Sequence, residues 1–341
     1  MNLPPRKTIL SIMYIPLICM ILSLSGCSSQ DAPLSETIVL KEYTLRDISV
    51  QAAGTDVSMH HIKRLSMTSE DTGWLLTADN ILYHTDNGIT DFKKVNVIKE
   101  DAPSSDYFVH GDFPDDASAY EVYFSSDSMI VESTTTSGNL WLQTQIPYGE
   151  YGGNGQAFLS FPDHNNGYLL YCSDPAAGQM TKILFKTKKG GAAFEPVADL
   201  SDKISGYPTG ISFSSTSRGY ITVTYHGQEE SLFQSGDGGV TWERVSLPPY
   251  DEETVTNYTD TYPPVFWGDD RLKGKLLLKC VSDDTYCYVL YQTLDGGITW
   301  NPDGTFYGDN ISSYSFFNET DGFFVDQTGK AFLLSCNDTN H

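Results

Sequence analysis

The sequence predicts an all-β protein built from about six repeats, each holding four short strands. Three observations predict this class. A glycine-rich turn motif recurs along the chain, a motif of glycine followed by an aromatic residue keeps the same period, and no long segment shows the apolar period of a helix. Four-stranded units repeated around an axis form a β-propeller, so we expect one propeller domain.

The composition suits short strands joined by tight turns. The 341 residues include 29 glycines, which favour turns, and 21 tyrosines and 17 phenylalanines, which favour strands. The formal net charge of −23 disfavours phosphate-rich partners, because binding them depends on lysine and arginine. We therefore expect no nucleic-acid partner.

The N-terminal segment is typical of an export signal. Residues 1–26 begin with Arg6 and Lys7 and continue as an uncharged apolar run that is short for a membrane span. The Leu-Ser-Gly-Cys sequence ending at Cys27 resembles the bacterial lipobox, which implies cleavage before Cys27 and lipidation of its thiol. The alternative is an ordinary or uncleaved signal with a coincidental cysteine. Residues 27–36 would then form a flexible tether, and 37–341 the propeller domain.

An acylated Cys27 implies a location as well as a modification. Two or three acyl chains hold a protein stably on a membrane. We expect the domain to be anchored in the cell envelope and to face away from the cytoplasm, with the outer face of a Gram-positive plasma membrane favoured. The membrane would be one partner, and the domain itself is expected to be monomeric.

The turn motif is clearest at residues 235–242, Ser-Gly-Asp-Gly-Gly-Val-Thr-Trp, and at 293–300, Thr-Leu-Asp-Gly-Gly-Ile-Thr-Trp. Weaker copies end at Phe92, Trp141 and Phe194, so the closing aromatic residues are 49, 53, 48 and 58 positions apart. Two unlike motifs with one shared period indicate true repeats. The copies of the second motif are Gly73-Trp74, Gly167-Tyr168, Gly219-Tyr220 and Gly322-Phe323.

Each repeat is expected to hold an inner strand, a Gly-aromatic strand, a third strand and an outer strand. The sixth repeat starts at 313–317 and lacks an outer strand, which the segment 36–45 can supply. Such closure pairs both ends of the chain and removes an open sheet edge. We predict six blades closed by this N-terminal strand, or seven if residues 40–59 contribute more. In the fourth repeat the strands are placed at 210–214, 219–224, 230–235 and 241–246.

The pattern Ser-x-Asp-Gly-Gly-x-Thr-Trp resembles the Asp-box, or bacterial neuraminidase repeat, over about residues 60–334. This repeat occurs in sialidases, sortilin-type receptors and photosystem II assembly-factor propellers, and the resemblance implies that these turns lie opposite the usual active site. An aspartate in such a turn can accept backbone N–H groups, and the closing tryptophan packs into the blade. The residues assigned this structural role are Asp86, Asp237, Thr241, Trp242, Asp295, Thr299 and Trp300.

A sialidase-like fold does not by itself imply sialidase activity. That chemistry needs three arginines around a central pocket, to clamp a carboxylate. Only Arg64 is expected near the axis, whereas Arg218 and Arg271 are expected in turns on the Asp-box face, and the Phe/Tyr-Arg-Ile-Pro motif is absent. We assign no catalytic residue, and enzymatic activity is left open but disfavoured.

The loops on the opposite face carry aromatic and acidic residues together, at 99–117, 147–155 and 247–264. Aromatic surfaces with carboxylates suit sugars, peptides or cations. The leading hypothesis is a non-catalytic binding or scaffolding module for a protein, peptide or glycan. The alternative is a non-sialidase glycoside hydrolase or another glycan-active enzyme. The candidate ligand-binding residues are Tyr107, Tyr148, Tyr151, Tyr250, Tyr258 and Tyr262.

Two cysteines are candidates for a disulfide. Cys280 and Cys287 flank a hairpin turn, and in an exported protein they could be bridged, the alternative being two thiols. The acidic pairs lack metal-ligand spacing, and no cofactor-binding fingerprint occurs. We expect neither a metal nor a cofactor.

Overall fold

The computed structural model describes residues 40–52, 55–56, 62–97, 109–153, 155–176, 180–224, 231–250, 258–282 and 285–336. All of them belong to the second of two compact units, Val39–His341. The first unit, Met1–Ile38, lies outside the described residues, together with the predicted signal, Cys27 and the tether. No helix among the described residues combines the length and the apolar composition needed to cross a membrane.

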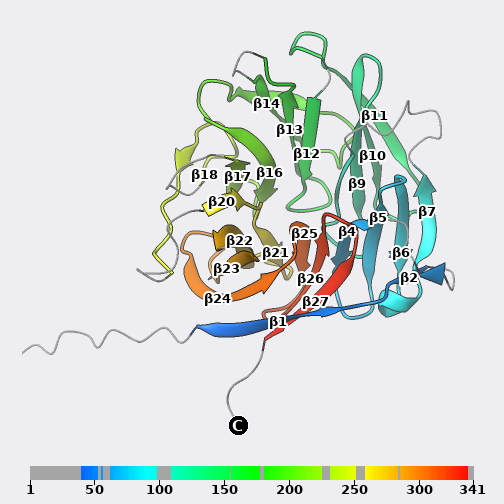
Figure 1. Cartoon of the computed structure of the whole chain (residues 1–341). Coiled ribbons are helices and arrows are strands. Elements are labelled where there is room, and N and C mark those ends of the chain that lie inside the picture. The colour runs from blue at the N-terminus through cyan, green and yellow to red at the C-terminus, as the bar shows by residue number, and fades with distance from the viewer. Residues whose placement is uncertain are drawn as a thin grey trace, which may run out of the picture. The chain divides into compact units, whose positions relative to one another are not determined.

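Four separate antiparallel sheets follow one another along the chain, and each has its four strands in sequence order. Figure 1 shows them arranged around a common centre. The first two sheets contain β4 (Ile62–Met67), β5 (Gly73–Thr77), β6 (Ile81–Thr85) and β7 (Lys93–Val97), then β8 (His110–Asp112), β9 (Ala119–Phe124), β10 (Ser128–Thr134) and β11 (Leu142–Pro147). The next two contain β12 (Gly155–Ser160), β13 (Gly167–Ser173), β14 (Lys182–Thr187) and β15 (Glu195–Asp199), then β16 (Tyr207–Phe213), β17 (Gly219–Thr224), β18 (Leu232–Ser235) and β19 (Glu243–Arg244).

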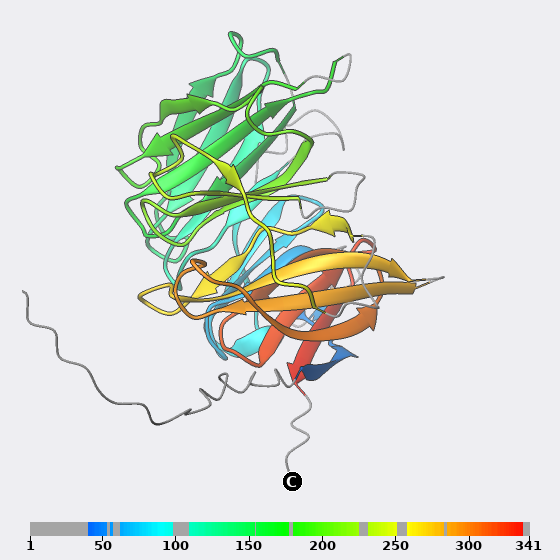
Figure 2. The same cartoon turned by 90° about the vertical axis from the view of Figure 1, so that its left-hand side faces the viewer.

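Nine further strands form one curled mixed sheet. Its first part contains β20 (Tyr258–Thr261), β21 (Val265–Trp267), β22 (Lys273–Ser282), β23 (Thr285–Thr293) and β24 (Asn301–Gly308), and its second part β25 (Ile311–Phe316), β26 (Asp321–Asp326) and β27 (Ala331–Cys336). The N-terminal strand β1 (Lys41–Asp47) joins the two parts, antiparallel to β27 and parallel to β24. Figure 2 shows the orange strands β22–β24 beside the red strands of the second part.

The pairing of β1 with β27 agrees with the expected N-terminal closure, and its parallel pairing with β24 was not foreseen. Besides β1, the segment 40–59 proposed for a seventh unit contributes, among the described residues, the two-stranded sheet of β2 (Gln51–Ala52) and β3 (Thr55–Asp56). In the fourth repeat the outer strand is Glu243–Arg244 alone, shorter than the predicted 241–246. The turn before β7 contains the 3₁₀ helix η2 (Gly88–Thr90).

The Gly-aromatic motif has a packing reason. In the third and fourth sheets the glycine that opens the second strand lies against a phenylalanine at the end of the first strand, and a Cβ at Gly167 or Gly219 would overlap the ring of Phe161 or Phe213. In the first sheet the partner is Met67, and the second sheet has Ala119 in place of the glycine. The aromatic residue after the glycine stacks on the same ring of the next sheet. Tyr168 lies parallel to Phe213, with ring centroids 3.5 Å apart. Stacked pairs of this kind contribute about 0.5–1.5 kcal/mol beyond their buried area. The motif thus joins each sheet to its neighbour.

Candidate functional site

Two cavities meet at the centre of the propeller, and both are lined by the first strands of the sheets. We call the cavity of about 730 Å³ that is lined by the starts of these strands, including Ile62, His110 and Ile311, the loop-side cavity. The cavity of about 440 Å³ that is lined by their ends and by the turns that follow, including Thr68 and Arg271, is the turn-side cavity. Both cavities are lined by Arg64, Asp112, Ser160, Ser212 and Val265.

In five of the six repeats a small polar side chain directly precedes the phenylalanine or methionine near the end of the first strand. Ser160 Oγ accepts a hydrogen bond from the backbone N–H of Phe213 (2.8 Å), and Ser315 Oγ donates one to the carbonyl of Leu65 (2.9 Å). Each bond links one sheet to the next, so the position has a structural role. The equivalent residues are Ser66, Asp112, Ser160, Ser212, Val265 and Ser315.

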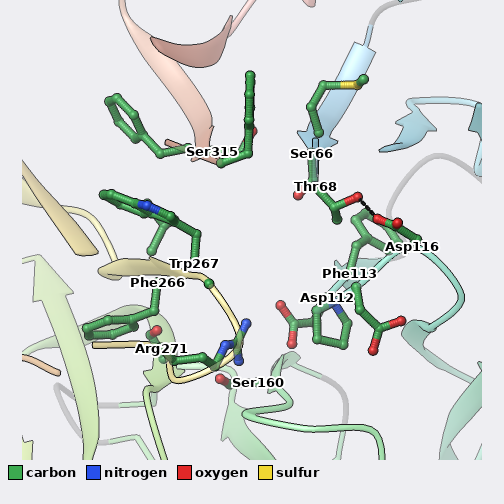
Figure 3. A pocket seen from close by; sticks show the side chains of 18 of the residues that line it. Ser66, Thr68, Asp112, Phe113, Asp116, Ser160, Phe266, Trp267, Arg271 and Ser315 are labelled. Atoms are coloured by element: carbon green, nitrogen blue, oxygen red, sulfur yellow. Dashed lines mark hydrogen bonds between the residues drawn. The ribbon is translucent and has the colours of Figure 1, made fainter. Parts of the chain in front are cut away.

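Asp112 places a carboxylate where most sheets have a serine. Its Oδ2 accepts the backbone N–H of Phe161 at 2.7 Å, and its Oδ1 lies 3.9 Å from a terminal nitrogen of Arg64. Arg271 reaches the same place from the turn between β21 and β22, and its guanidinium donates to the carbonyl of Phe161 at 2.7 Å. In Figure 3 the side chains of Asp112 and Arg271 point toward one another across the turn-side cavity. Burial raises the pKa of Asp112, and the two arginines oppose that rise.

His110 borders the loop-side cavity beside Arg64. Its Nδ1 accepts the backbone N–H of Leu159 at 3.2 Å, so a neutral ring carries its hydrogen on Nε2. Burial first, and then the charges of Arg64 and Lys63, hold the pKa of His110 well below its usual range. Arg64 lies 3.5 Å from Nε2, and its own Nε is buried without a hydrogen-bond partner.

The other carboxylates that line the two cavities are mostly held by groups of the chain. Asp260 pairs with Lys279 at 2.6 Å, and Asp326 Oδ1 accepts the backbone N–H groups of Thr328 (2.8 Å) and Lys330 (2.9 Å). On the turn side, Asp115 Oδ1 accepts the N–H groups of Ala117 and Ser118, and Asp116 accepts the hydroxyl of Thr68. Among the described residues, no group of three or more His, Cys, Asp or Glu residues is placed to hold a metal ion.

The four predicted tyrosines whose side chains the structure describes have different surroundings. Tyr148 is buried, with only 4% of its surface exposed, and its hydroxyl donates to the carbonyl of Ser125. Tyr151 and Tyr250 are half-buried and pack against core clusters. Tyr262 lines the loop-side cavity and donates to the carbonyl of Ile311 at 2.8 Å. Tyr107 and the side chain of Tyr258 lie outside the described residues.

The Asp-box turns contain dense hydrogen bonding. Asp237 Oδ1 accepts the N–H groups of Val240 (3.0 Å) and Thr241 (2.9 Å), and Oδ2 accepts the Thr241 hydroxyl (2.6 Å). These bonds, the Thr241 hydroxyl foremost, lower the pKa of Asp237 to about 2. Asp295 binds Thr299 in the same way, through its N–H (2.9 Å) and its hydroxyl (2.7 Å). Asp86 instead pairs with Lys93 at 3.3 Å, on the surface.

The closing tryptophans pack between sheets. Trp300 is buried against Tyr220 and Phe266, and Trp242 lies edge-on to Phe213 with its indole N–H donating to the carbonyl of Gly239 at 2.9 Å.

Cys280 and Cys287 are direct cross-strand partners on β22 and β23. Both are free thiols in this structure, so their disulfide stays a prediction. Burial raises the pKa of Cys280 to about 12, which leaves its thiol protonated.

Sequence reasoning placed Arg271 in the correct turn but missed that its side chain reaches the axis. Asp112 and His110 both fall within the loop 99–117 of the predicted binding face, but neither was assigned a role of its own. One signal for Asp112 was available, because Gly111-Asp112-Phe113 aligns with Leu159-Ser160-Phe161 and shows an acid at a serine position. The partners of Arg271 lie too far away in the chain for any local pattern to reveal them.

No family model matches this chain, and no curated protein matches it. Among solved structures, "YCF48 bound to D1 peptide" is 14% identical with a TM-score of 0.49, covering 87% of this chain and 95% of that chain. The GH74 xyloglucanase of Xanthomonas campestris is 13% identical with a TM-score of 0.50, and the match covers 85% of this chain and 53% of that one. This chain therefore spans about half the length of the xyloglucanase. At such identities the likeness concerns the fold alone, and the chain is similar to the xyloglucanase in its all-β propeller architecture.

Proposed function

We propose that this chain is a non-catalytic binding module that receives part of a protein, peptide or glycan in the loop-side cavity. The observation that carries the proposal is the character of this cavity. Its volume is about 730 Å³, and its lining includes the apolar residues Val109, Phe158 and Ile211 beside the polar residues Arg64 and His110. Ligand sites are commonly concave and mostly apolar, with a few convergent polar groups.

The alternative, a glycan-active hydrolase, is less well supported. Glycoside hydrolysis uses two carboxyl groups flanking the bond, one of which must give up and regain a proton. The carboxylates of the loop-side cavity are committed elsewhere, since Asp260 pairs with Lys279, Asp326 holds its own turn and Asp112 binds Phe161. These interactions favour recognition without turnover.

We also propose the finer architecture and the location. Six blades are supported by the division of the nine-stranded sheet at β1, because each part resembles one four-stranded unit in strand order. The lipobox sequence supports an acylated Cys27, a tether over 27–36 and a domain facing outward from the cell envelope. Mass spectrometry of the envelope-extracted chain tests the anchor, and an unmodified Cys27 contradicts it.

The function is tested by blocking the mouth of the loop-side cavity. Gln327 is exposed and lines this cavity, so Gln327→Trp should obstruct it without disturbing the core. Leu140→Trp is the matched control, because Leu140 is 73% exposed and does not line this cavity. A glycan array and a peptide library should show ligands bound by the wild type and by Leu140→Trp and lost in Gln327→Trp. Turnover on a glycosidase and lyase panel would overturn the non-catalytic proposal.

A further inference from the structure

We propose that the turn-side cavity is a second binding site, which takes one uncharged sugar ring, either free or at the end of a glycan. The inference goes beyond the proposed function, which uses the loop-side cavity at the other end of the first strands. It is carried by three features of the turn-side cavity: an aromatic side, buried hydroxyls without a hydrogen-bond partner, and a lining that mixes hydrogen-bond donors with acceptors. The volume of about 440 Å³ lies within the range of small-molecule sites, about 300–1,000 Å³.

One side of the turn-side cavity is aromatic. Trp267 and Phe317 line it and are half-buried, and the centroid of the Trp267 ring lies 6.1 Å from that of Phe316, which also lines it. Figure 3 shows Trp267 on one side of the cavity and Ser66 and Thr68 on the other. The C–H groups of a sugar ring form apolar faces that pack on aromatic rings, while its hydroxyls remain free to bond to polar groups. A sugar ring between these two sides would therefore satisfy both.

Two buried serines of this cavity have hydroxyls without a hydrogen-bond partner. Ser66 and Ser212 line the cavity and are only 8% and 9% exposed. At the equivalent positions of two other sheets, the hydroxyls of Ser160 and Ser315 bond to backbone groups of a neighbouring sheet. Within the described part of the chain neither Ser66 nor Ser212 has such a bond, and neither hydroxyl oxygen is closed off from solvent. A buried hydroxyl without a partner is unfavourable, so a ligand hydroxyl that bonds to it would be held there.

The other polar groups of the lining combine donors with acceptors. Among the described residues, the indole N–H of Trp267 and the carboxylate of Asp269 have no hydrogen-bond partner. Arg271 adds a guanidinium with five N–H groups, one of which donates to the carbonyl of Phe161. A sugar hydroxyl both donates and accepts, whereas an ammonium group only donates and a carboxylate only accepts. A ligand rich in hydroxyls therefore matches this lining best.

The charges of the lining favour a neutral ligand. Two arginines and four aspartates give a formal charge of −2, and they are Arg64, Arg271, Asp112, Asp115, Asp116 and Asp269. The excess of carboxylates disfavours an anion, and the two guanidinium groups bordering the same space disfavour a cation. We therefore expect a neutral sugar to bind more tightly than a sugar of the same shape that carries a carboxylate or an ammonium group.

The test titrates the full chain with neutral and charged sugars, followed by saturation-transfer difference NMR. The matched pairs are D-glucose with D-glucuronate, and N-acetyl-D-glucosamine with D-glucosamine, and D-galactose and D-mannose extend the neutral set. We expect saturable binding of at least one neutral sugar. Where that sugar belongs to a matched pair, its charged partner should bind at least about threefold more weakly.

Two variants locate the site. Trp267→Leu should weaken binding of the neutral sugar at least about tenfold, because the aromatic packing surface is lost. Trp141→Leu is the matched control, since Trp141 is also half-buried but lines neither cavity. Ser66→Ala should weaken binding by several-fold without lowering the unfolding midpoint, because the Ser66 hydroxyl has no bond within the described chain to lose. If Trp267→Leu fails to fold, Ser66→Ala still decides the matter.

The inference is overturned if no neutral sugar binds saturably, if Ser66→Ala binds as the wild type does, or if a charged sugar binds more tightly than its neutral partner. The loop-side variant Gln327→Trp separates the two sites. Sugar that still binds Gln327→Trp supports the turn-side site, even if that variant also captures its other ligands normally and the proposed function falls. Sugar lost in Gln327→Trp overturns the inference and leaves the proposed function standing.

The source of the sugar ring is decided by methylating its anomeric oxygen. A methyl glycoside that binds as tightly as the free sugar supports a ring at the end of a glycan, because the linking oxygen is then not enclosed. Binding that is lost on methylation supports a free monosaccharide.

Discussion

At the scale of single residues, the backbone of Phe161 organises the centre of the propeller. The N–H of Phe161 donates to Asp112, and its carbonyl accepts from Arg271. The backbone N–H and carbonyl of Phe161 thereby bind side chains of opposite charge. The ring of the same residue stacks on Tyr120, with ring centroids 3.4 Å apart. The electrostatics of the cavities thus depend on the same contact that packs two sheets together.

A second residue-scale feature is the buried carboxyl of Glu121 on β9. It is fully buried opposite Glu132 of β10, and Asn96 of β7 donates to both, at 3.3 and 2.9 Å. Burial first, and then the charge of Glu132, raises the pKa of Glu121 from 4.5 to about 8, with Lys63 opposing. The folded chain therefore keeps a proton that the unfolded chain releases. Its free energy of unfolding should fall as the pH rises from about 4.5 to about 8.

Glu121→Gln should flatten this dependence, because a neutral amide replaces a carboxyl that must otherwise ionise in a buried place. At about pH 8 we expect the variant to exceed the wild type in free energy of unfolding by more than about 1 kcal/mol. Urea unfolding across this pH range measures the difference, with the exposed Glu243→Gln as the control. An unaltered slope in Glu121→Gln would assign the pH dependence to another group.

The Asp-box aspartates allow a matched comparison. Asp237 accepts two backbone N–H groups and the Thr241 hydroxyl, whereas Asp86 makes an exposed ion pair with Lys93. We expect Asp237→Ala to lower the free energy of unfolding by about 1–2 kcal/mol, because the alanine removes the acceptor of three hydrogen bonds that stabilise the turn. Asp86→Ala should change it by less than about 0.5 kcal/mol, as for other exposed pairs. Chemical denaturation of both variants checks this, and equal losses would contradict it.

At the scale of elements, the junction between first and second strands sets how the sheets meet. Gly219 opens β17 against the ring of Phe213, and the next residue, Tyr220, carries the contact onward to Phe266. The short turn between these strands also accepts the N–H of the Asp-box glycine, as Ser217 does from Gly238 at 2.8 Å. The turn between the first and second strands is therefore hydrogen-bonded to the Asp-box turn at the same end of the sheet.

Gly219→Ala should destabilise this junction, since the added Cβ overlaps the Phe213 ring and forces a shift of well-packed groups. We expect a loss of about 1–3 kcal/mol in the free energy of unfolding. Gly236→Ala is the matched control, because nothing lies within 4 Å of a Cβ built there. Thermal unfolding of the pair measures the effect, and similar midpoints would show that the ring has room to move.

At the scale of the whole molecule, the N-terminal strand is tied into the far end of the chain by a buried charge cluster. Asp303 of β24 accepts from Lys275 of β22 at 2.5 Å, from Lys41 of β1 at 2.9 Å and from the hydroxyl of Tyr43. The side chains of Lys275 and Asp303 are 0% and 6% exposed. These partners lower the pKa of Asp303 against the opposing effect of burial.

Asp303→Ala should lower the free energy of unfolding by about 3–5 kcal/mol, because it leaves the buried ammonium of Lys275 without its carboxylate partner. Combining it with Lys275→Met should restore much of the loss, since an apolar side chain then fills the site. Calorimetric unfolding of the single and double variants measures the coupling. A double variant no more stable than Asp303→Ala would mean that the loss comes from the packing of the Asp303 side chain and not from the unpaired charge of Lys275.

Much of the architecture could be predicted because its signals are local. The Asp-box turns, the Gly-aromatic junctions and the strands around them depend on residues close together in the chain, and the predicted pairing of an N-terminal strand with the last strand agrees with β1 and β27. The burial of Tyr148 could not be predicted, because a tyrosine in a loop carries no mark of the core cluster that receives it. The parallel pairing of β1 with β24 likewise has no sequence signature.

The sequence by itself determined the all-β class, the repeat and the chemistry of the turns, since each follows from a few neighbouring residues. Only the tertiary structure decided the centre of the molecule. Arg64, His110, Asp112 and Arg271 come from three different sheets, and they meet because closing the ring brings the first strands to one axis. The buried Nε of Arg64, for example, lacks a hydrogen-bond acceptor only in the closed ring, because its surroundings are formed by residues from distant parts of the chain.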